Sequence, residues 1–339
     1  MTSPDWLVAI VRCPACRSSV RRAHDAVECA NGHRYRDDGH LDLWSDDTDD
    51  VTRATVDSFG YEWTTFDANN DEDVAFWSRH SSDLDLSEFG EALALDAGCG
   101  KGRYTRFIAP QVGRLVALDA SEAAVAAARN MKDLDNVGVV RADLRAVPFD
   151  PASFDFVSSI GVLHHLSDPR DGFLRLAGLL RPGGRMFVYL YSRPEGRGVR
   201  AAGLAVADRL RLVTVRVPHR LLRIASIPMA ALLWLGLVLP GSIGERLGLN
   251  ALAGLPMHTY RHSPFRALWL DTFDRLSAPV EHRYVWSELA PWFEDAGLDV
   301  VAVREDAGFY IVADRPSGVD RDLGPPGSRR GAATTLSDP

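Results

Sequence analysis

Leu95-Asp96-Ala97-Gly98-Cys99-Gly100-Lys101-Gly102 is the stretch that decides the fold of this chain. A short apolar run leads into three glycines that alternate with other residues, and a helical pattern follows from about Arg103 to Ala109. Glycine is needed where a backbone turns with positive φ or approaches a ligand closely, and the N-terminus of the next helix presents unpaired N–H groups. The stretch therefore predicts a strand, a cofactor-binding loop that uses Gly98, Gly100 and Gly102, and a helix.

Acidic residues end the next two predicted strands. The strand 114–118 is followed by Asp119, about 20 residues beyond the glycine loop, where a carboxylate accepts the two hydroxyls of a ribose. The strand 137–141 leads into Asp143, which can receive an adenine amine, and Leu144, which can cover the ring. NAD and S-adenosylmethionine (SAM) sites share the first acid. A dehydrogenase, or a Rossmann fold that binds nothing, has no need of the second acid, so the pattern favours SAM.

As an ordered set, these segments resemble the class I SAM-dependent methyltransferases of the ubiquinone/menaquinone type, densely from about residue 90 to 192. The resemblance implies an α/β, Rossmann-like fold with seven strands and SAM at the carboxyl ends of a parallel sheet. Asp96 and Gly98 would then lie near the methionine part, Asp119 on the ribose and Asp143 on the adenine. The matching segments are Leu95 to Gly102, Asp119, Ala142-Asp143-Leu144, Phe154 to Leu166 and Arg181-Pro182-Gly183-Gly184.

Three of the four cysteines lie near the amino terminus, in Cys13-Pro14-Ala15-Cys16 and in Cys29-Ala30-Asn31-Gly32-His33. Three thiolates and one imidazole suit tetrahedral zinc, and such a site would supply much of the folding free energy of about 45 residues. A redox Cys-x-x-Cys is the competing interpretation, which the Cys29/His33 pair makes less favourable. The spacing predicts a zinc-ribbon-like module with Cys13, Cys16, Cys29 and His33 as ligands. The arrangement also resembles, more distantly, rRNA guanine-N1 methyltransferases, in which a similar module contributes to RNA recognition, although those enzymes lack the His164-His165 pair.

The segment 159–166 after the fourth strand holds the candidate catalytic residues. It lacks the Asn/Asp-Pro-Pro-Tyr signature of planar-nitrogen methylases and the carboxylate of magnesium-dependent catechol enzymes, which leaves oxygen, carbon or an aliphatic amine as the acceptor atom. A histidine at a strand end can deprotonate a hydroxyl near neutral pH, so His164 and His165 are the candidate bases. The alternative is that one of them caps the helix near Asp168 and the other packs beside SAM. Tyr189 and Tyr191 are predicted to line the pocket.

A long segment, 193–276, separates the fifth strand from the last helix, Ser287 to Ala296. Ser287 is the predicted N-cap of that helix and Gly297 its predicted stop. Residues 224–244 carry no charge, and the part from Met229 to Leu239 is bounded by Pro228 and Pro240. Eleven residues are too short to cross a bilayer of about 30 Å, so we expect a lid helix over a hydrophobic substrate or, as the alternative, an interfacial helix. Five residues could either contact the acceptor or form an ion-pair network that holds the insertion in place: His258, His262, Asp271, Asp274 and Arg283. Basic residues precede the apolar run: Arg197, Arg200, Arg209, Arg211, Arg216, His219, Arg220 and Arg223.

The chain divides by these features into six predicted parts. The aromatic segment from Ser58 to Phe66 either packs the amino-terminal arm onto the fold or forms a lid with Tyr61, Glu62 and Trp63 at the cofactor mouth. The parts are 1–45 (zinc-ribbon-like module), 46–90 (linker and aromatic arm), 91–192 (SAM-binding core), 193–276 (helical insertion), 277–315 (last helix and strands) and 316–339 (disordered tail).

Composition bounds the partners. The 339 residues carry a formal net charge of −8, with an acidic run from Asp46 to Asp50, which argues against a chain built to bind nucleic acid. No signal segment precedes Asp5, so we expect a cytoplasmic protein, with membrane association through 224–244 as the alternative. The chain also resembles methyltransferases of bacterial secondary-metabolite and glycan clusters. We predict O-methylation of a hydrophobic small-molecule or carrier-linked metabolite; the rivals are an rRNA base methyltransferase and a non-catalytic, zinc-stabilised SAM-binding adapter.

Overall fold

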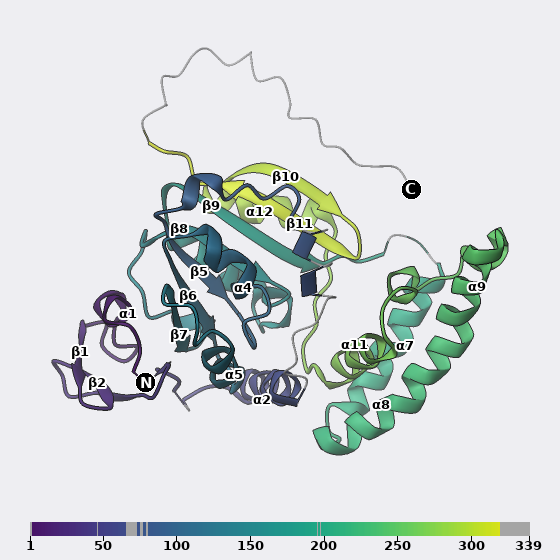
Figure 1. The fold of residues 1–339 in the computed structure, drawn as a ribbon, viewed down its shortest axis with the longest axis horizontal. Helices are drawn as coiled ribbons and strands as arrows, with labels where there is room; N and C mark the ends of the chain where they lie inside the picture. Colours follow the sequence, from purple (N-terminus) through teal and green to yellow (C-terminus); the bar gives the residue numbers. More distant parts are fainter. Residues whose placement is uncertain are drawn as a thin grey trace, which may run out of the picture. The chain divides into compact units, whose positions relative to one another are not determined.

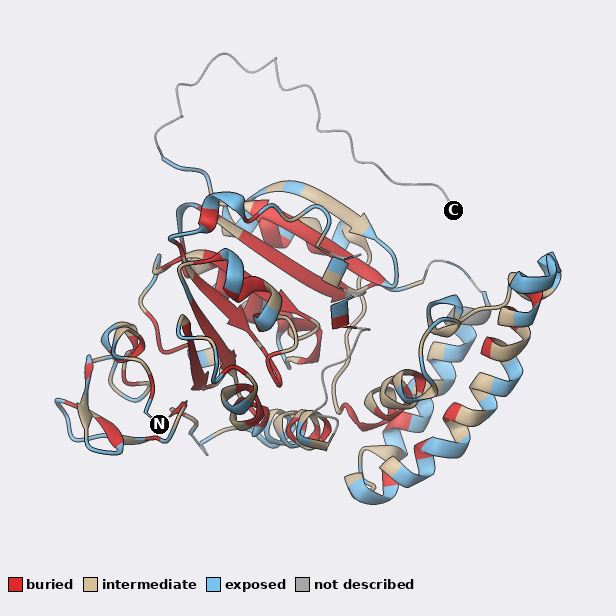
Figure 2. Cartoon of the chain, viewed as in Figure 1, coloured by how far each residue is buried: buried red, intermediate tan, exposed pale blue. Residues whose placement is uncertain are grey.

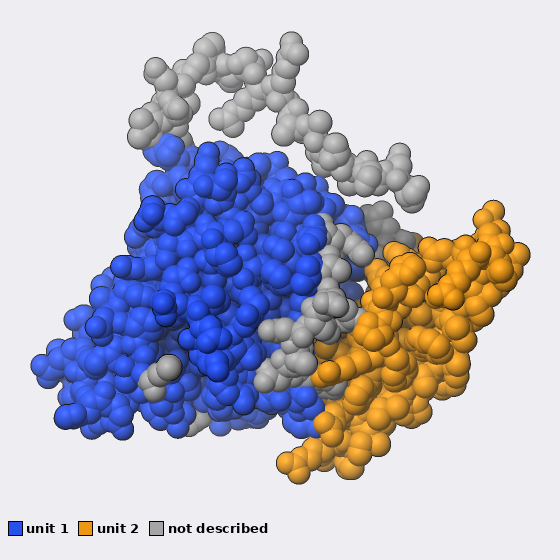
Figure 3. Space-filling view, viewed as in Figure 1, with its two compact units in different colours: residues 1–193, 280–339 blue, residues 194–279 orange. Residues whose placement is uncertain are grey.

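The computed structural model describes residues 2–45, 47–65, 73–74, 77–78, 81–194, 196 and 198–318. These fall into two compact units (Figure 3), which we call the catalytic unit (1–193 and 280–339) and the helical unit (194–279). Some segments interpreted from the sequence lie outside the described residues: Asp46, Phe66, the linker 67–72, Arg197, the side chain of Arg200 and the tail 319–339.

A single sheet forms the centre of the catalytic unit (Figure 1). Its seven core strands lie in the order β7-β6-β5-β8-β9-β11-β10, which confirms the predicted seven-stranded α/β fold. β5 to β9 run parallel, whereas β11 is antiparallel to both β9 and β10. The strands are β5 (Leu93–Ala97), β6 (Arg114–Asp119), β7 (Val137–Arg141), β8 (Phe154–Ile160), β9 (Leu180–Tyr191), β10 (Asp299–Glu305) and β11 (Gly308–Asp314).

Helices flank the sheet because its parallel strands are apolar on both faces. Figure 2 shows the central strands as buried. The flanking helices are α4 (Thr105–Ile108), α5 (Ala123–Asn130), α6 (Pro169–Gly178) and α12 (Trp286–Ala296).

The caps of two of these helices were only partly predicted. α6 is capped by Asp168, which accepts the N–H of Asp171 at 3.0 Å, so the interpretation of a histidine as its cap was wrong. α12 begins at Trp286, so the prediction of Ser287 as its N-cap was wrong. Val285 is the N-cap, and Glu288 accepts the N–H of Val285 at 3.2 Å. Gly297 ends α12 with φ 67°, as predicted.

The amino-terminal module adds four more strands to the same sheet. β4 pairs in parallel with β7, with Leu41 opposite Val140, so the module covers an edge of the core that would otherwise present unpaired backbone groups. Arg17 ties the module to the core as well, because its guanidinium donates to the carbonyls of Val147 at 2.7 Å and Phe149 at 2.5 Å. The elements are α1 (Asp5–Ile10), β1 (Val20–Ala23), β2 (Ala26–Cys29), β3 (Arg34–Asp37) and β4 (Leu41–Asp42).

The helical unit contains one long helix from His219 to Leu247. It is formed by α8 (His219–Leu233), the π-helical segment η5 (Trp234–Val238) and α9 (Leu239–Leu247), and its length and composition would allow it to cross a membrane. The expectation that Pro228 and Pro240 bound a segment of eleven residues was therefore wrong. A proline ring meets the carbonyl four residues earlier, and for Pro240 that residue lies within the wider π turn. The other helices are α7 (Val199–Thr214), α10 (Asn250–Ala253), η6 (His258–Tyr260) and α11 (Phe265–Ser277).

Candidate active site and metal centre

The glycine loop follows β5 and has the positive φ angles that the sequence predicted. Gly98, Gly100 and Gly102 have φ values of 83°, 54° and 86°, which L side chains rarely adopt. A Cβ atom on Gly98 would lie only 2.3 Å from Cγ2 of Val162. The loop at the end of β5 is therefore pressed against the segment that follows β8.

Asp119, at the end of β6, reaches across to this loop. Its Oδ2 accepts the N–H of Gly100 at 2.8 Å, and its Oδ1 accepts the N–H and hydroxyl of Ser121 at 2.8 and 2.6 Å. Burial raises the pKa of Asp119, while these donors act in the opposite direction. The side chain keeps part of its surface accessible, so its carboxylate is placed to accept the hydroxyls of a ribose.

Asp96 is almost fully buried at the end of β5. The hydroxyl of Thr105 donates to its Oδ2 at 2.6 Å, and the hydroxyl of Ser158 donates to its Oδ1 at 3.1 Å. Burial raises the pKa of Asp96 to about 6, the two hydroxyls oppose this shift, and the negative charge of Asp119 adds to it. Sequence reasoning missed Thr105 and Ser158, since single hydroxyls on a helix and a strand carry no recognisable pattern.

Asp143 is engaged by a partner that the sequence analysis missed. It caps the short helix η3 (Leu144–Ala146), accepts the N–H of Arg145 at 2.8 Å and pairs with Nη2 of the same residue at 2.7 Å. Arg145 also contacts Asp49 and Thr48 in the arm that leads from the amino-terminal module. An adenine amine would share the Asp143 carboxylate with the Arg145 guanidinium. Leu144, the next residue after Asp143, is buried.

The aromatic arm lies on helix α2 (Asp50–Thr65) and packs onto the fold. Gly60 of α2 sits against Ser121 and Glu122, where an added Cβ would lie 3.4 Å from each. Trp63 of α2 lies beside Gly100, and the Lys101 ammonium stands 5.7 Å from the centre of the Trp63 ring. The arm thus packs on the fold, which was one of its two predicted roles. Trp63 of the arm lies at the glycine loop, where the alternative role as a lid would place it.

His164 and His165 lie in the short helix η4 (Leu163–His165) after β8. His164 is fully buried, and neither of its ring nitrogens has a hydrogen-bond partner. Burial lowers the pKa of His164 well below 6.5, and the neighbouring His165, Arg283 and His282 lower it further. Its imidazole is therefore neutral at physiological pH. The Nδ1 atom of His165, by contrast, lies 2.7 Å from the carbonyl of Val280.

Aromatic and charged groups surround this histidine pair. The His164 ring stacks on Tyr191 with centroids 3.8 Å apart, and Phe59 of α2 lies 4.7 Å from the His165 ring. Arg283 stands 5.1 Å above the Tyr191 ring and pairs with the carboxylate of Glu281. The sequence analysis named Arg283 and Tyr191 but missed Glu281 and the packing of Phe59, because these residues come from segments far apart in the chain.

The other predicted acceptor contacts are found in the helical unit. His262 lies 3.8 Å from the carboxylate of Glu245, and the Tyr260 hydroxyl donates to Asp271. The contact between Tyr260 and Asp271 is a hydrogen bond, and both interpretations of these residues stay predictions. The same unit also holds His258 and Asp274, whereas Arg283 belongs to the catalytic unit.

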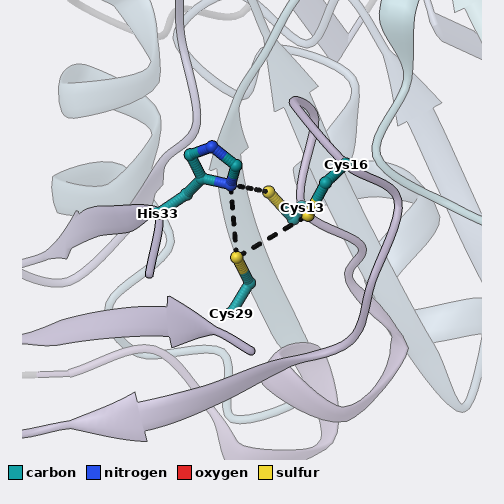
Figure 4. A group of neighbouring side chains, drawn as sticks. All are labelled: Cys13, Cys16, Cys29 and His33. Atoms are coloured by element: carbon teal, nitrogen blue, oxygen red, sulfur yellow. Dashed lines mark hydrogen bonds between the residues drawn. The ribbon is translucent and has the colours of Figure 1, made fainter. Parts of the chain in front are cut away.

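Cys13, Cys16, Cys29 and His33 converge in the amino-terminal module (Figure 4). Their ligand atoms all lie within 4.8 Å of one another, with Cys16 Sγ 3.7 Å from Cys29 Sγ. The Nδ1 atom of His33 lies 3.5 Å from Cys13 Sγ and 3.3 Å from Cys29 Sγ. Tetrahedral zinc with bonds of about 2.3 Å to sulfur and 2.0–2.1 Å to nitrogen requires separations of about 3.8 and 3.5 Å. The four residues therefore fit zinc, and the sulfur separation is far too long for a disulfide.

The methyltransferase domain family matches residues 95–188. These residues contain the glycine loop, Asp119, Asp143 and the histidine pair. The ends of β5, β6, β7 and β8 lie within the matched residues, whereas Tyr191, at the end of β9, lies just beyond them.

Named relatives match the same region. The chain is 35% identical over 108 residues to the 2-phytyl-1,4-naphtoquinone methyltransferase of Thermosynechococcus vestitus, which covers 31% of this chain and 48% of that protein. It is 31% identical over 108 residues to an uncharacterized methyltransferase of Mycobacterium tuberculosis, covering 32% of this chain and 55% of that protein. The chain thus spans about half the length of these relatives. A SAM-dependent methyltransferase structure from Aquifex aeolicus aligns with a TM-score of 0.40 at 16% identity, over 79% of this chain and all of that one.

The residues of the methyltransferase domain fit SAM as its cofactor. Close backbone approach is available at the glycine loop, and Asp119 presents a carboxylate beside it. The buried, unpartnered imidazole of His164 lies beyond Val162, which itself packs on Gly98. Cofactor loop and candidate base therefore meet at one edge of the sheet.

Proposed function

We propose that this chain is a SAM-dependent methyltransferase that acts on a hydrophobic small-molecule or carrier-linked acceptor, with oxygen as the preferred methylated atom. One observation carries the proposal: a fully buried His164 with two unpartnered ring nitrogens lies next to the cofactor loop of a methyltransferase domain. Buried polar atoms are nearly always hydrogen-bonded, so an orphaned imidazole at such a place points to a ligand that completes it.

Binding and orientation come first in the mechanism. Asp119 would hold the ribose, the loop from Gly98 to Gly102 would allow the cofactor to lie against the backbone, and Leu144 would cover the adenine. SAM, when bound, supplies a methyl group on a sulfonium that reacts with an in-line nucleophile. Because such a transfer depends on a nucleophile held about 3 Å away in a dry site, positioning supplies much of the rate. Phe59, Tyr191 and the buried sheet end would exclude water.

His164 would take the proton from the acceptor hydroxyl. Its depressed pKa keeps the imidazole neutral at physiological pH, so a ring nitrogen is available to accept a proton. Tyr191 would fix the orientation of the ring by stacking on it. His165, which is hydrogen-bonded to the carbonyl of Val280, would support the loop, with a direct part in proton transfer as the alternative.

The hydrophobic acceptor is supported by three observations. The surroundings of His164 are aromatic, and a relative that matches the domain is named for a phytyl-substituted naphthoquinone. The chain also carries an apolar helical insertion directly after β9.

We further propose that zinc in the amino-terminal module is structural. Four protein ligands complete a tetrahedral shell and leave no open position for substrate. The metal would hold the module whose β4 extends the catalytic sheet.

The test is a labelling screen. Purified protein and methyl-labelled SAM are incubated with organic-soluble metabolites and with RNA from the same source, and the label is then partitioned. We expect the label in the organic phase. His164→Gln should reduce this labelling roughly a hundredfold, which is the low end of the rate contribution of a general base. Val301→Gln, an exposed substitution on β10, is the control and should leave the activity unchanged. Label in RNA would overturn the acceptor class, and SAM binding without turnover on any extract would favour the adapter.

A further inference from the structure

The helical unit exposes many large hydrophobic side chains. Fifteen large hydrophobic side chains are exposed among the described residues, and twelve of them belong to this unit, although it forms only about a quarter of the chain. Figure 2 shows exposed positions along α8 and α9. Scattered single hydrophobic residues are normal on a protein surface, but a concentration of this size marks an interaction site.

The long helix carries several large aliphatic side chains on one exposed face, whereas Leu222 and Val238 are buried. Leu221, Ile224, Leu232 and Leu235 are 59%, 61%, 72% and 57% exposed. They recur at helical spacing and so share one face. The buried positions of the helix include Ser226, Ala230, Gly241 and Gly244. α11 packs against the inner face, where the indole N–H of Trp269 donates to the Ser226 hydroxyl at 2.9 Å.

Charge identifies the partner. Residues 209–244 contain five arginines and no acidic residue, in a chain whose net charge is −8, and Asp208 and Glu245 border this stretch. Arg211 is buried and pairs with Asp208, which leaves four of these arginines for an external partner. Arg216 and Arg220 are exposed near the start of the long helix, Arg246 is exposed near its end, and Arg209 is exposed on α7. Aliphatic side chains flanked by arginines complement a bilayer with anionic lipids. The aliphatic side chains would enter the acyl region, and the arginines would contact the lipid phosphates.

The topology of the chain excludes a transmembrane span. Residues 192–193 and 284 are hydrogen-bonded neighbours, and β9 and β11 pair in one sheet, so both ends of the helical unit return to the same folded unit. A single crossing would place those ends on opposite sides of the membrane. A second crossing is needed, but the described residues contain no other helix of sufficient length and apolarity. α7 and α11 both carry charges in their central turns.

We propose that the helical unit docks on the surface of anionic membranes. The face formed by Leu221, Ile224, Leu232, Leu235 and Ile243, here called the aliphatic face, would lie in the interfacial layer, and the flanking arginines would contact the lipid phosphates. Docking of this kind would bring the catalytic unit to acceptors dissolved in the bilayer. Docking is independent of the proposed methyl transfer, because it requires neither SAM nor an acceptor.

Flotation of the full-length protein with lipid vesicles, without SAM or acceptor, tests the proposal. We expect the protein to float with vesicles of phosphatidylcholine and phosphatidylglycerol, and to bind pure phosphatidylcholine at least about tenfold more weakly. The double variant Leu232→Glu/Leu235→Glu should reduce binding at least about tenfold, since two large side chains no longer enter the apolar layer. Arg216→Gln/Arg220→Gln should weaken binding about tenfold on the anionic vesicles alone.

Val301→Glu is the matched control, because Val301 is 52% exposed on β10 in the catalytic unit. This variant should bind vesicles like the wild type, and carbonate extraction of cell membranes should release the wild-type protein, as expected for a peripheral contact. Three outcomes would overturn the proposal. The first is absence of flotation with anionic vesicles. The second is a dimer that Leu232→Glu dissociates without any vesicle binding, which would assign the aliphatic face to a second copy. The third is retention in the carbonate-washed membrane.

Discussion

Asp119 is the residue on which the cofactor assignment depends most directly. It accepts three hydrogen bonds from the protein and still keeps part of its surface accessible. We expect Asp119→Ala to weaken SAM binding by about 1–3 kcal/mol, because the ribose hydroxyls lose a charged acceptor and the N–H of Gly100 loses its partner. Isothermal titration calorimetry measures this, with the exposed Asp135→Ala as the control. Unchanged affinity for Asp119→Ala would refute the ribose assignment.

Asp96 gives a prediction about pH. Its pKa is about 6 in the folded chain and ordinarily 3.8, so the folded state holds a proton that the unfolded state releases between these values. The contribution of protonated Asp96 to the free energy of unfolding is therefore fully present below pH 3.8 and is lost as the pH rises to about 6. Because two pKa units correspond to about 3 kcal/mol, the Asp96→Asn protein should gain up to that much relative to wild type across this window.

Urea unfolding of both proteins in the absence of SAM, at pH values from 4 to 7, measures the difference. Thr105 and Ser158 can still hydrogen-bond an asparagine, so the variant should fold. A free-energy difference that stays constant with pH would contradict the raised pKa of Asp96.

At the scale of elements, zinc is expected to hold the amino-terminal module against β7. We expect Cys16→Ser to lower the zinc content and to expose β1 to β4 to amide hydrogen exchange. SAM binding should persist, because the glycine loop and Asp119 belong to the core strands. Metal analysis by mass spectrometry and exchange measurements test this, with Ser45→Ala, an exposed position outside the cluster, as the control. Full zinc occupancy in the Cys16→Ser protein would exclude Cys16 as a ligand.

Elements were predictable from sequence where a local pattern determines them. The strand 137–141 and the stop of α12 at Gly297 were predicted as observed, since an apolar run and a C-terminal glycine are local signals. The pairing of β4 with β7 was not predictable, because two residues of a short strand carry no pattern that names a partner about 100 positions away. The continuation of the long helix through Pro240 was missed for another reason, since proline usually ends a helix and the π turn before it has no sequence signature.

The same division applies to the candidate site. Its backbone features, the three glycines and the acids at strand ends, follow a spacing that a sequence displays. The surroundings of His164 come from Phe59, Tyr191 and Arg283, which only the folded sheet brings together. The exposure of the aliphatic face was equally hidden, because a run of apolar residues reads as buried until the packing of its neighbours is known.

At the scale of the whole molecule, the helical unit should be separable from the catalytic unit. The N–H of Arg193 donates to the carbonyl of Tyr284 at 2.7 Å, and the N–H of Tyr284 donates to the carbonyl of Tyr191 at 3.0 Å. We expect a chain in which a short glycine-serine linker replaces 195–279 to fold and to bind SAM like the wild type. Its methylation of hydrophobic acceptors should fall by roughly tenfold or more, because positioning of the acceptor is lost.

Calorimetry with SAM and the labelling assay measure the two properties separately. A linker of the same composition inserted between residues 254 and 255, with the helical unit kept, is the control. Wild-type methylation by the shortened chain would show that the helical unit has no part in acceptor delivery.

The pairing of β4 with β7 has a consequence for synthesis on the ribosome. Leu41 emerges about 100 residues before Val140, so at 5–20 residues per second the edge of β4 waits roughly 5–20 s for its partner. During that interval the nascent module is a small sheet with an open edge, a form that is prone to join other unpaired strands. Early capture of zinc would keep it folded while it waits. Zinc supply during growth should then affect the yield of native protein more than it affects the finished molecule.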